Sequence, residues 1–495
     1  MEPLGTITMY YPFLGDEAKR VVEELVQDAM SYYDFVQSLM KAVNDYPMDS
    51  DFAWFSLIQA LSYPDTWKMM QARLEENVQT KPLAFFRRDT YDTLANTQLE
   101  GLEAAMKQAI SSNPDDWILV HLYMAATYMA PEPVRSHYLD SARAIIDRNQ
   151  DLQRFMILIH FQEAYDLRMQ GDVEGAIRAW DKVHEIADEY DDIFSVAAAL
   201  VQKANALKDF DVHKALELYD EIYSMLLGRL TEFDATQIVA MMTAVCYEAL
   251  GEYDLALSLL FKDFEIKSQI SDDVQVTPAL IVSRIYCTLE MPEQALEWLK
   301  AKAELHRLDE SMLHSVAANA LVLQGQLDDA TRHLVAAHNG AMKSGDEQVL
   351  GDYLYAKGLY ELADGDLNNA ETTLEEALKL GDPHLQIQVN LGLLALTRCE
   401  ILKGLDAPVS GSDKDYSGPW MKRLEKHATE KNYPGIQMQH ALLKASYQTQ
   451  IGEPEMARLT LENALTISDS PGVKTLRKKI EQKLEELDSI EQEQT

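Results

Sequence analysis

The stretch Ala244–Leu260, AVCYEALGEYDLALSLL, contains the features that decide the fold of this chain. Ala244 and Tyr247 lie on one face of a predicted helix, and Gly251 follows where a left-handed residue can end that helix. A second apolar helix begins near Tyr253, and Ala256 leaves room for close contact with Ala244. The stretch therefore predicts two amphipathic helices joined by a tight turn.

The same hairpin pattern recurs along the chain, which indicates a repeat array. A small residue opens the second helix of each unit, at Ala176, Ala215, Ala256, Ala295, Ala330, Ala370 and Ala457. A turn glycine stands five positions earlier at Gly171, Gly251, Gly325, Gly365 and Gly452, whereas Phe210 and Glu290 occupy that position in the other two units. The interval from Ala370 to Ala457 is about twice the others, which predicts one degenerate unit between them.

The first helices carry small residues in the same register, at Ala164, Ala244, Ser283, Ala318, Gly358 and Ala445. With the large apolar residues of the second helices, this pattern resembles the tetratricopeptide repeat (TPR) family, and Gly358–Pro383, GLYELADGDLNNAETTLEEALKLGDP, matches it best. The resemblance implies an all-α, right-handed superhelix (α-solenoid) of TPR-like helical hairpins. Most repeat intervals are about 40 residues rather than the family's 34, so the helices are expected to be about one turn longer.

Three regions are predicted along the chain. Residues 1–112 form an irregular helical N-terminal region, either degenerate repeats or a cap, and begin with an extended arm over residues 1–14. Residues 113–467 form the repeat array, starting with helices after Asn113 and from Pro133 to Arg148. A Gly/Ser/Pro-rich loop insertion at 404–419 interrupts the array, and a mobile connector is favoured there over a loop that orders on a ligand. Residues 468–495 form a solvated C-terminal capping helix and an acidic tail.

Composition limits the compartment and the partners. The chain has 44 Lys+Arg against 81 Asp+Glu, a formal net charge of −37, which disfavours direct binding to nucleic acid or anionic membranes. An acidic surface suits a basic protein partner, but solubility or adaptation to a salty cytoplasm is the favoured explanation of the charge. The cysteines Cys246, Cys287 and Cys399 form no CxxC pair and are expected to be reduced core residues. No apolar run reaches the roughly 18 residues that span a bilayer, and no secretory leader is visible, so a cytoplasmic location is expected.

No pattern indicates catalysis, a cofactor or a metal. The pairs His333/His338 and His306/His314 do not reproduce the HExxH spacing that puts two imidazoles on one helix face. Phosphate loops, dinucleotide fingerprints and nucleophile elbows are likewise missing from the sequence. The chain is therefore predicted not to be an enzyme, and an enzyme concealed in residues 1–112 is the least supported alternative.

The resemblance implies a concave groove lined by the first helix of each unit. Family geometry nominates groove positions at Phe161, Tyr165, Arg168, Met241, Val245, Glu248, Arg284, Asn319, Tyr355 and Leu359. Packing between repeats is the alternative role for each of them. The lysine, arginine and asparagine clamp of chaperone-tail receptors is not reproduced, because Tyr355 and Leu359 follow Asn319 in the next unit.

The first hypothesis is a non-enzymatic scaffold or adaptor that presents an acidic concave groove to a peptide or protein partner. The alternative is a ligand- or peptide-responsive regulatory sensor in which binding changes the superhelix pitch and a separate chain carries the effector. Self-association of the chain stays open under both hypotheses.

Overall fold

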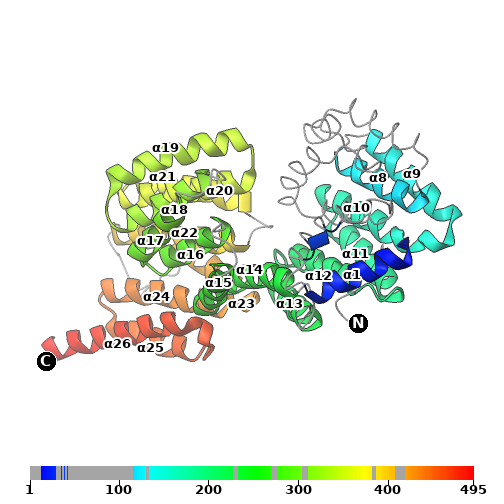
Figure 1. Ribbon diagram of the computed structural model, residues 1–495. Coiled ribbons are helices and arrows are strands. Elements are labelled where there is room, and N and C mark those ends of the chain that lie inside the picture. The colour runs from blue at the N-terminus through cyan, green and yellow to red at the C-terminus, as the bar shows by residue number, and fades with distance from the viewer. Residues whose placement is uncertain are drawn as a thin grey trace. The chain divides into compact units, whose positions relative to one another are not determined.

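The computed structural model describes residues 13–28, 115–129, 133–226, 232–268, 276–303, 310–381, 386–406 and 418–494, with isolated positions 35, 38, 39 and 42. Every regular element within these ranges is a helix, which confirms the predicted all-α class (Figure 1). Most of the expected N-terminal arm, the proposed boundary at residue 112 and most of the 404–419 insertion lie outside the described residues.

The chain folds into two compact units, which we describe separately. Unit 1 comprises Met1–Ala206 and Glu217–Val239, and unit 2 comprises Leu207–Leu216 and Ala240–Thr495. The described helices that lie wholly or mainly in unit 1 are α1 (Asp16–Asp28), α8 (Asp116–Met129), α9 (Val134–Arg148), η3 (Gln150–Phe155), α10 (Met156–Met169), α11 (Val173–Glu189), α12 (Ile193–Leu207) and α13 (Val212–Leu226).

Helices α8 and α9 of unit 1 form the hairpin that the sequence predicts after Asn113 and Pro133. The ring of Phe13 stacks on Trp117 at 5.9 Å between centroids and lies 5.6 Å from the ring of Phe155, so Phe13 packs against α8 and η3. The next hairpin, α10 and α11, is capped by Asp172, whose carboxylate accepts a hydrogen bond of 2.8 Å from the Gly175 amide.

The described residues of unit 2 form six helix pairs and a final helix. The pairs are α14 (Glu232–Leu250) with α15 (Tyr253–Ser268), α16 (Val276–Thr288) with α17 (Pro292–Ala303), α18 (Glu310–Leu323) with α19 (Leu327–Ser344), α20 (Glu347–Ala363) with α21 (Leu367–Gly381), α22 (Gln386–Asp406) with α23 (Pro419–Glu430), and α24 (Pro434–Gln450) with α25 (Pro454–Leu465). Short η4 (Pro471–Val473) leads into α26 (Lys474–Gln494). The degenerate unit is thus α22–α23, and the loop insertion joins its two helices.

The hairpin turns have the predicted backbone. All five turn glycines adopt positive φ, between 72° at Gly325 and 86° at Gly365. The seven alanines that define the repeat register each have no exposed surface. Glu290 occupies the turn position with φ of 56°, a left-handed conformation that is unfavourable for a side chain other than glycine. The repeat register deduced from the sequence is therefore confirmed.

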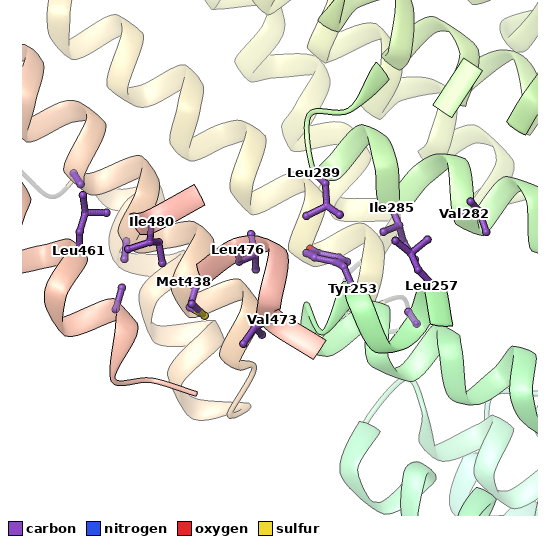
Figure 2. Packing of buried hydrophobic residues seen from close by; sticks show 14 of the residues in the cluster. Tyr253, Leu257, Val282, Ile285, Leu289, Met438, Leu461, Val473, Leu476 and Ile480 are labelled. Atoms are coloured by element: carbon purple, nitrogen blue, oxygen red, sulfur yellow. The ribbon is translucent and has the colours of Figure 1, made fainter. Parts of the chain in front are cut away.

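The two ends of unit 2 share one hydrophobic core. Buried residues of α14 to α16, among them Tyr253, Leu257 and Ile285, form a single cluster with Met438 of α24 and Leu476 of α26. Figure 2 shows the side chains of α24 to α26 facing those of α15 and α16. A simple solenoid makes contacts only between adjacent repeats. Unit 2 instead closes on itself, which the sequence pattern did not predict.

Polar contacts reinforce this closure. The Thr475 amide and hydroxyl donate to the Asp254 carboxylate at 2.8 and 2.6 Å, joining the start of α26 to the start of α15. Asn390 of α22 donates to the Ala249 carbonyl at 2.7 Å and so satisfies an acceptor in the last turn of α14. Helix α26 was expected as a solvated cap, but it buries Leu476, Ile480 and Leu487 in the shared core.

Candidate functional site: a cavity within unit 2

Five of the first helices of unit 2 line a cavity of about 670 Å³. Its wall is formed by α16, α18, α20, α22 and α24, and α26 completes it. Because unit 2 closes on itself, the groove expected between successive first helices is lined here by α26 as well.

Four of the predicted groove residues, Arg284, Asn319, Tyr355 and Leu359, line this cavity. Glu248 does not line it but binds Arg284. Met241 and Val245 pack against the shared core and are also outside the lining. A groove role for all of these residues remains a prediction.

The other three predicted groove residues lie on α10 in unit 1. Tyr165 is about half exposed, with 49% of its surface accessible, whereas Phe161 and Arg168 are partly buried. The neighbouring Gln162 and Asp166 are joined by a 3.0 Å hydrogen bond, and Arg135 pairs with Asp166 at 3.1 Å. Phe161, Tyr165 and Arg168 stay a predicted surface of unit 1 and form no part of the unit 2 cavity.

A buried ion pair anchors one side of the cavity. Arg284 donates from Nε and from one terminal nitrogen to the two carboxylate oxygens of Glu248, at 2.6 and 2.7 Å. Burial raises the pKa of nearby Asp352, and the charge of Arg284 and a 2.8 Å hydrogen bond from Gln388 only partly offset that effect. The pair orients the Arg284 side chain and connects α14 to α16.

One polar atom of the lining, in the side chain of Asn319, has no hydrogen-bond partner among the described residues. Asn319 is only 6% exposed, and its Oδ1 accepts no hydrogen bond from the residues that the structure describes. The carboxamide lies in the cavity wall with Tyr355 of the next first helix. A buried acceptor without a donor is costly, so its position in a cavity wall indicates a place for a ligand donor.

The charge of the lining is opposite to that of the whole chain. Four basic residues, Arg284, Arg398, Lys479 and Lys483, face two acidic residues, Glu290 and Glu486. The acidic concave face expected from the net charge is therefore not found in this cavity. Net charge sums over the entire surface and does not determine the charge of one recess.

The ion pairs of Glu290 explain why this residue, rather than glycine, occupies the turn position. Its carboxylate pairs with Arg398 of α22 at 2.5 Å and with Lys479 of α26 at 3.3 Å, and Lys479 also donates to the Leu289 carbonyl at 2.6 Å. Burial alone would raise the pKa of Glu290, but the charges and hydrogen bonds of Arg398 and Lys479 outweigh it and lower the pKa. The strained turn residue thus links three parts of the closed unit.

The apolar wall and three of the four basic lining residues, Arg398, Lys479 and Lys483, were not predicted from the sequence. Leucines of α20, α22 and α24 form much of the lining, including Leu362, Leu394 and Leu442. Arg398 and Lys479 lie in the degenerate unit and in the final helix, outside the repeat register used for the prediction. The only available sign was Glu290, an acidic residue at a position that favours glycine.

A second cavity of about 990 Å³ lies between α17, α18 and α19. His314 and His333 line it, and their Nδ1 atoms are 2.9 Å apart. Across the described residues, no group of three or more potential ligands could hold a metal ion. The histidine pair is therefore a hydrogen-bonded contact between helices.

Other features bear on the compartment. Cys246 and Cys399 are buried and Cys287 is partly buried, and all three are free thiols. Burial raises the pKa of Cys246 and of Cys287 to about 12. Among the helices that the structure describes, none has the length and apolarity needed to cross a membrane.

Comparisons with known proteins give structural likeness only. No family model matches the chain, and no curated protein matches it. Similar solved structures include a Rap protein complexed with competence and sporulation factor, 15% identical, covering 69% of this chain and 100% of that chain at a TM-score of 0.42. The APC/C hetero-tetramer Cut9–Hcn1 is 13% identical, covering 96% of this chain and 98% of that chain at a TM-score of 0.30. The P58(IPK) TPR domain is 14% identical, covering 75% of this chain and 99% of that chain at a TM-score of 0.20.

The chain's own hairpin geometry defines its class: it is a helical repeat protein of TPR-like hairpins. Positive-φ turns and buried register alanines carry this assignment.

Proposed function

We propose that this chain is a non-enzymatic protein-interaction module, and that the unit 2 cavity holds a segment of a partner protein. The convergence of five first helices and α26 on one recess is the observation that carries the proposal. Side chains at equivalent positions of successive hairpins act together on one bound segment in this arrangement.

The composition of the recess supports binding. It combines a leucine-rich wall with a few oriented polar groups, as ligand sites do, and about 670 Å³ lies within the usual range for such sites. The ion pair of Arg284 with Glu248 fixes one polar group in place before any partner arrives, which reduces the entropy lost on binding. We further propose a cytoplasmic location, in which the free thiols remain reduced.

Two exposed leucines provide a matched test. Leu402 lines the cavity and is 36% exposed, whereas Leu459 on α25 is 58% exposed and lies outside the lining. Leu402→Glu should reduce partner capture from a native lysate, because it places a charge against the apolar wall. Leu459→Glu should capture as the unmodified chain does. Equal capture by all three proteins, with unchanged helical circular dichroism, would exclude the cavity as the binding surface.

A second candidate function is a sensor in which a small molecule occupies the same cavity and an effector lies on another chain. The lining of one cavity by both α16 and α26 favours this alternative, since a ligand there would contact the two helices together. A metabolite panel that raises the melting temperature of the unmodified chain but not of Leu402→Glu would support it.

A further inference from the structure

We propose that the unit 2 cavity selects an extended acidic peptide segment: its carboxylate lies at Arg398, Lys479 and Lys483, its apolar side chains contact the leucine wall, and its backbone N–H donates to Asn319. This inference rests on the proposed function and specifies the chemistry of the partner.

Charge complementarity is the first argument. Arg398 and Lys479 share a single carboxylate, that of Glu290, so this part of the lining keeps an excess positive charge. Lys483 adds a further cation, which pairs within α26 with the exposed Glu486 at 2.7 Å. The rest of the chain is strongly acidic. A basic ligand would therefore be attracted to other parts of the surface and repelled by these lining residues.

The apolar wall is the second argument. Leu359 and Leu362 of α20, Leu391 and Leu394 of α22, and Leu442 of α24 line the recess. A purely ionic ligand would leave this surface in contact with water, whereas a segment that carries apolar side chains would cover it.

Asn319 separates a peptide from a fatty acid. Both have an apolar body and a carboxylate, but only a peptide has backbone N–H groups. Asn319 lines the cavity and is more than nine-tenths buried, and its Oδ1 has no donor among the described residues. A peptide N–H supplies that donor, and an acyl chain does not.

The experiment begins with a selection from a library that contains acidic, neutral and basic peptides. The full chain is immobilised and incubated with a displayed library of random peptides, and the enriched sequences are compared with the input. Enrichment of acidic, leucine-rich or similar apolar sequences supports the inference. Enrichment of basic peptides that Leu402→Glu fails to bind would overturn it while the proposed function stands, and no enrichment of any peptide would overturn both.

Three variants then locate the contacts, with fluorescence anisotropy of an enriched peptide as readout. Lys483→Gln should weaken binding about fivefold to tenfold, whereas Lys478→Gln, a control for the exposed neighbour outside the lining, should not. Asn319→Leu should weaken binding about tenfold without lowering the melting temperature, because it removes a buried unpaired acceptor. A purely structural role of Asn319 would instead lower the melting temperature and leave the affinity of the folded protein unchanged.

A fatty acid competitor completes the test. Palmitate should not displace the peptide at palmitate concentrations below its critical micelle concentration. Displacement by palmitate, with affinity insensitive to Asn319→Leu, would assign the cavity to an acyl chain and overturn the peptide inference.

Discussion

The backbones of Gly251 and Gly435 touch, although they belong to hairpins at opposite ends of unit 2. A Cβ placed on Gly435 would lie 2.0 Å from the Gly251 carbonyl oxygen, and one on Gly251 would lie 2.7 Å from the Gly435 backbone. Gly251 also needs its positive φ of 75° to end α14. Two glycines are therefore required where the turn of the first hairpin meets the start of α24, and this contact closes the unit.

Gly435→Ala tests the closure of unit 2, because the contact with Gly251 decides whether the substitution raises or lowers the free energy of unfolding. Gly435 lies in the first turn of α24, where alanine without a steric conflict would be neutral or stabilising by up to about 1 kcal/mol. The backbone of Gly251 cannot yield as a flexible side chain could, so we expect a loss of about 1–3 kcal/mol. Chemical denaturation of the full chain measures the change.

Gly392→Ala is the control for this prediction. Gly392 lies within α22, and an added Cβ would have its nearest neighbour at 3.4 Å, an ordinary contact. This variant should be neutral or more stable. If Gly435→Ala behaved in the same way, the two ends of unit 2 would not be in contact.

The Glu248–Arg284 pair predicts strong coupling between α14 and α16. Glu248 is 4% exposed, and Arg284→Met would leave its carboxylate buried without a cation. We expect that single change to cost about 3–5 kcal/mol, and Glu248→Leu with Arg284→Met to cost less, because the Glu248 carboxylate no longer stays buried without its cation. Hydrogen exchange of α14 and α16 should be accelerated in the single variant and largely restored in the double variant. Additive effects of the two changes would contradict the coupling.

Glu290 predicts a dependence of stability on acidic pH. Because its pKa is lowered in the folded state, its contribution is present above the unfolded value near 4.5 and is lost as the pH falls through the folded pKa. The carboxylate is half exposed, so Glu290→Gln should cost only about 0.5–1 kcal/mol at pH 7. The stabilities of the two proteins should converge as the pH falls below about 4.

A glycine variant separates the two roles of Glu290. Glu290→Gly loses the ion pairs but relieves the left-handed backbone, so it should be more stable than Glu290→Gln by about 1 kcal/mol. Thermal unfolding at pH 7 in low salt compares them. Equal stability of the glycine and glutamine variants would show that the φ of 56° stores no strain.

Local features of the fold were predictable because the same contacts between small residues recur within each hairpin. Ala256 against Ala244 and the turn at Gly251 recur in fixed register, so the hairpin boundaries and the cavity residues Arg284 and Asn319 follow from counting along the chain. The contact of Gly251 with Gly435 has no such period, because it joins two units across the closure.

The charge of the cavity was not predictable for a related reason. Arg398 and Lys479 belong to the degenerate unit and to the final helix, so no repeat register brings them to Glu290. Their placement depends on how far the array curves before it closes. Curvature sums small rotations between repeats, and the hydrophobic pattern of one repeat does not specify those rotations.

The histidine pair between α18 and α19 predicts a second dependence of stability on pH. Its cause differs from that at Glu290, because here burial disfavours the charged form of the side chain. Nδ1 of His314 lies 2.9 Å from Nδ1 of His333, a hydrogen bond that requires one of these nitrogens to be unprotonated. Burial lowers the pKa of His333, the charge of His314 lowers it further, and Asp329 only partly opposes this shift. The folded state thus binds protons less readily than the unfolded state. Its stability should be full above about pH 6.5 and should fall as the pH decreases.

His333→Gln tests this origin, because glutamine retains polarity without titrating in this range. The melting temperature of the unmodified chain should drop between pH 7.5 and 5.5, and His333→Gln should drop less. Burial also lowers the pKa of His440, so some pH dependence of the same sign should remain in the variant. His184→Gln, on α11 of unit 1, should keep the full drop. An equal drop in His333→Gln and in the unmodified chain would place the acid sensitivity outside this pair.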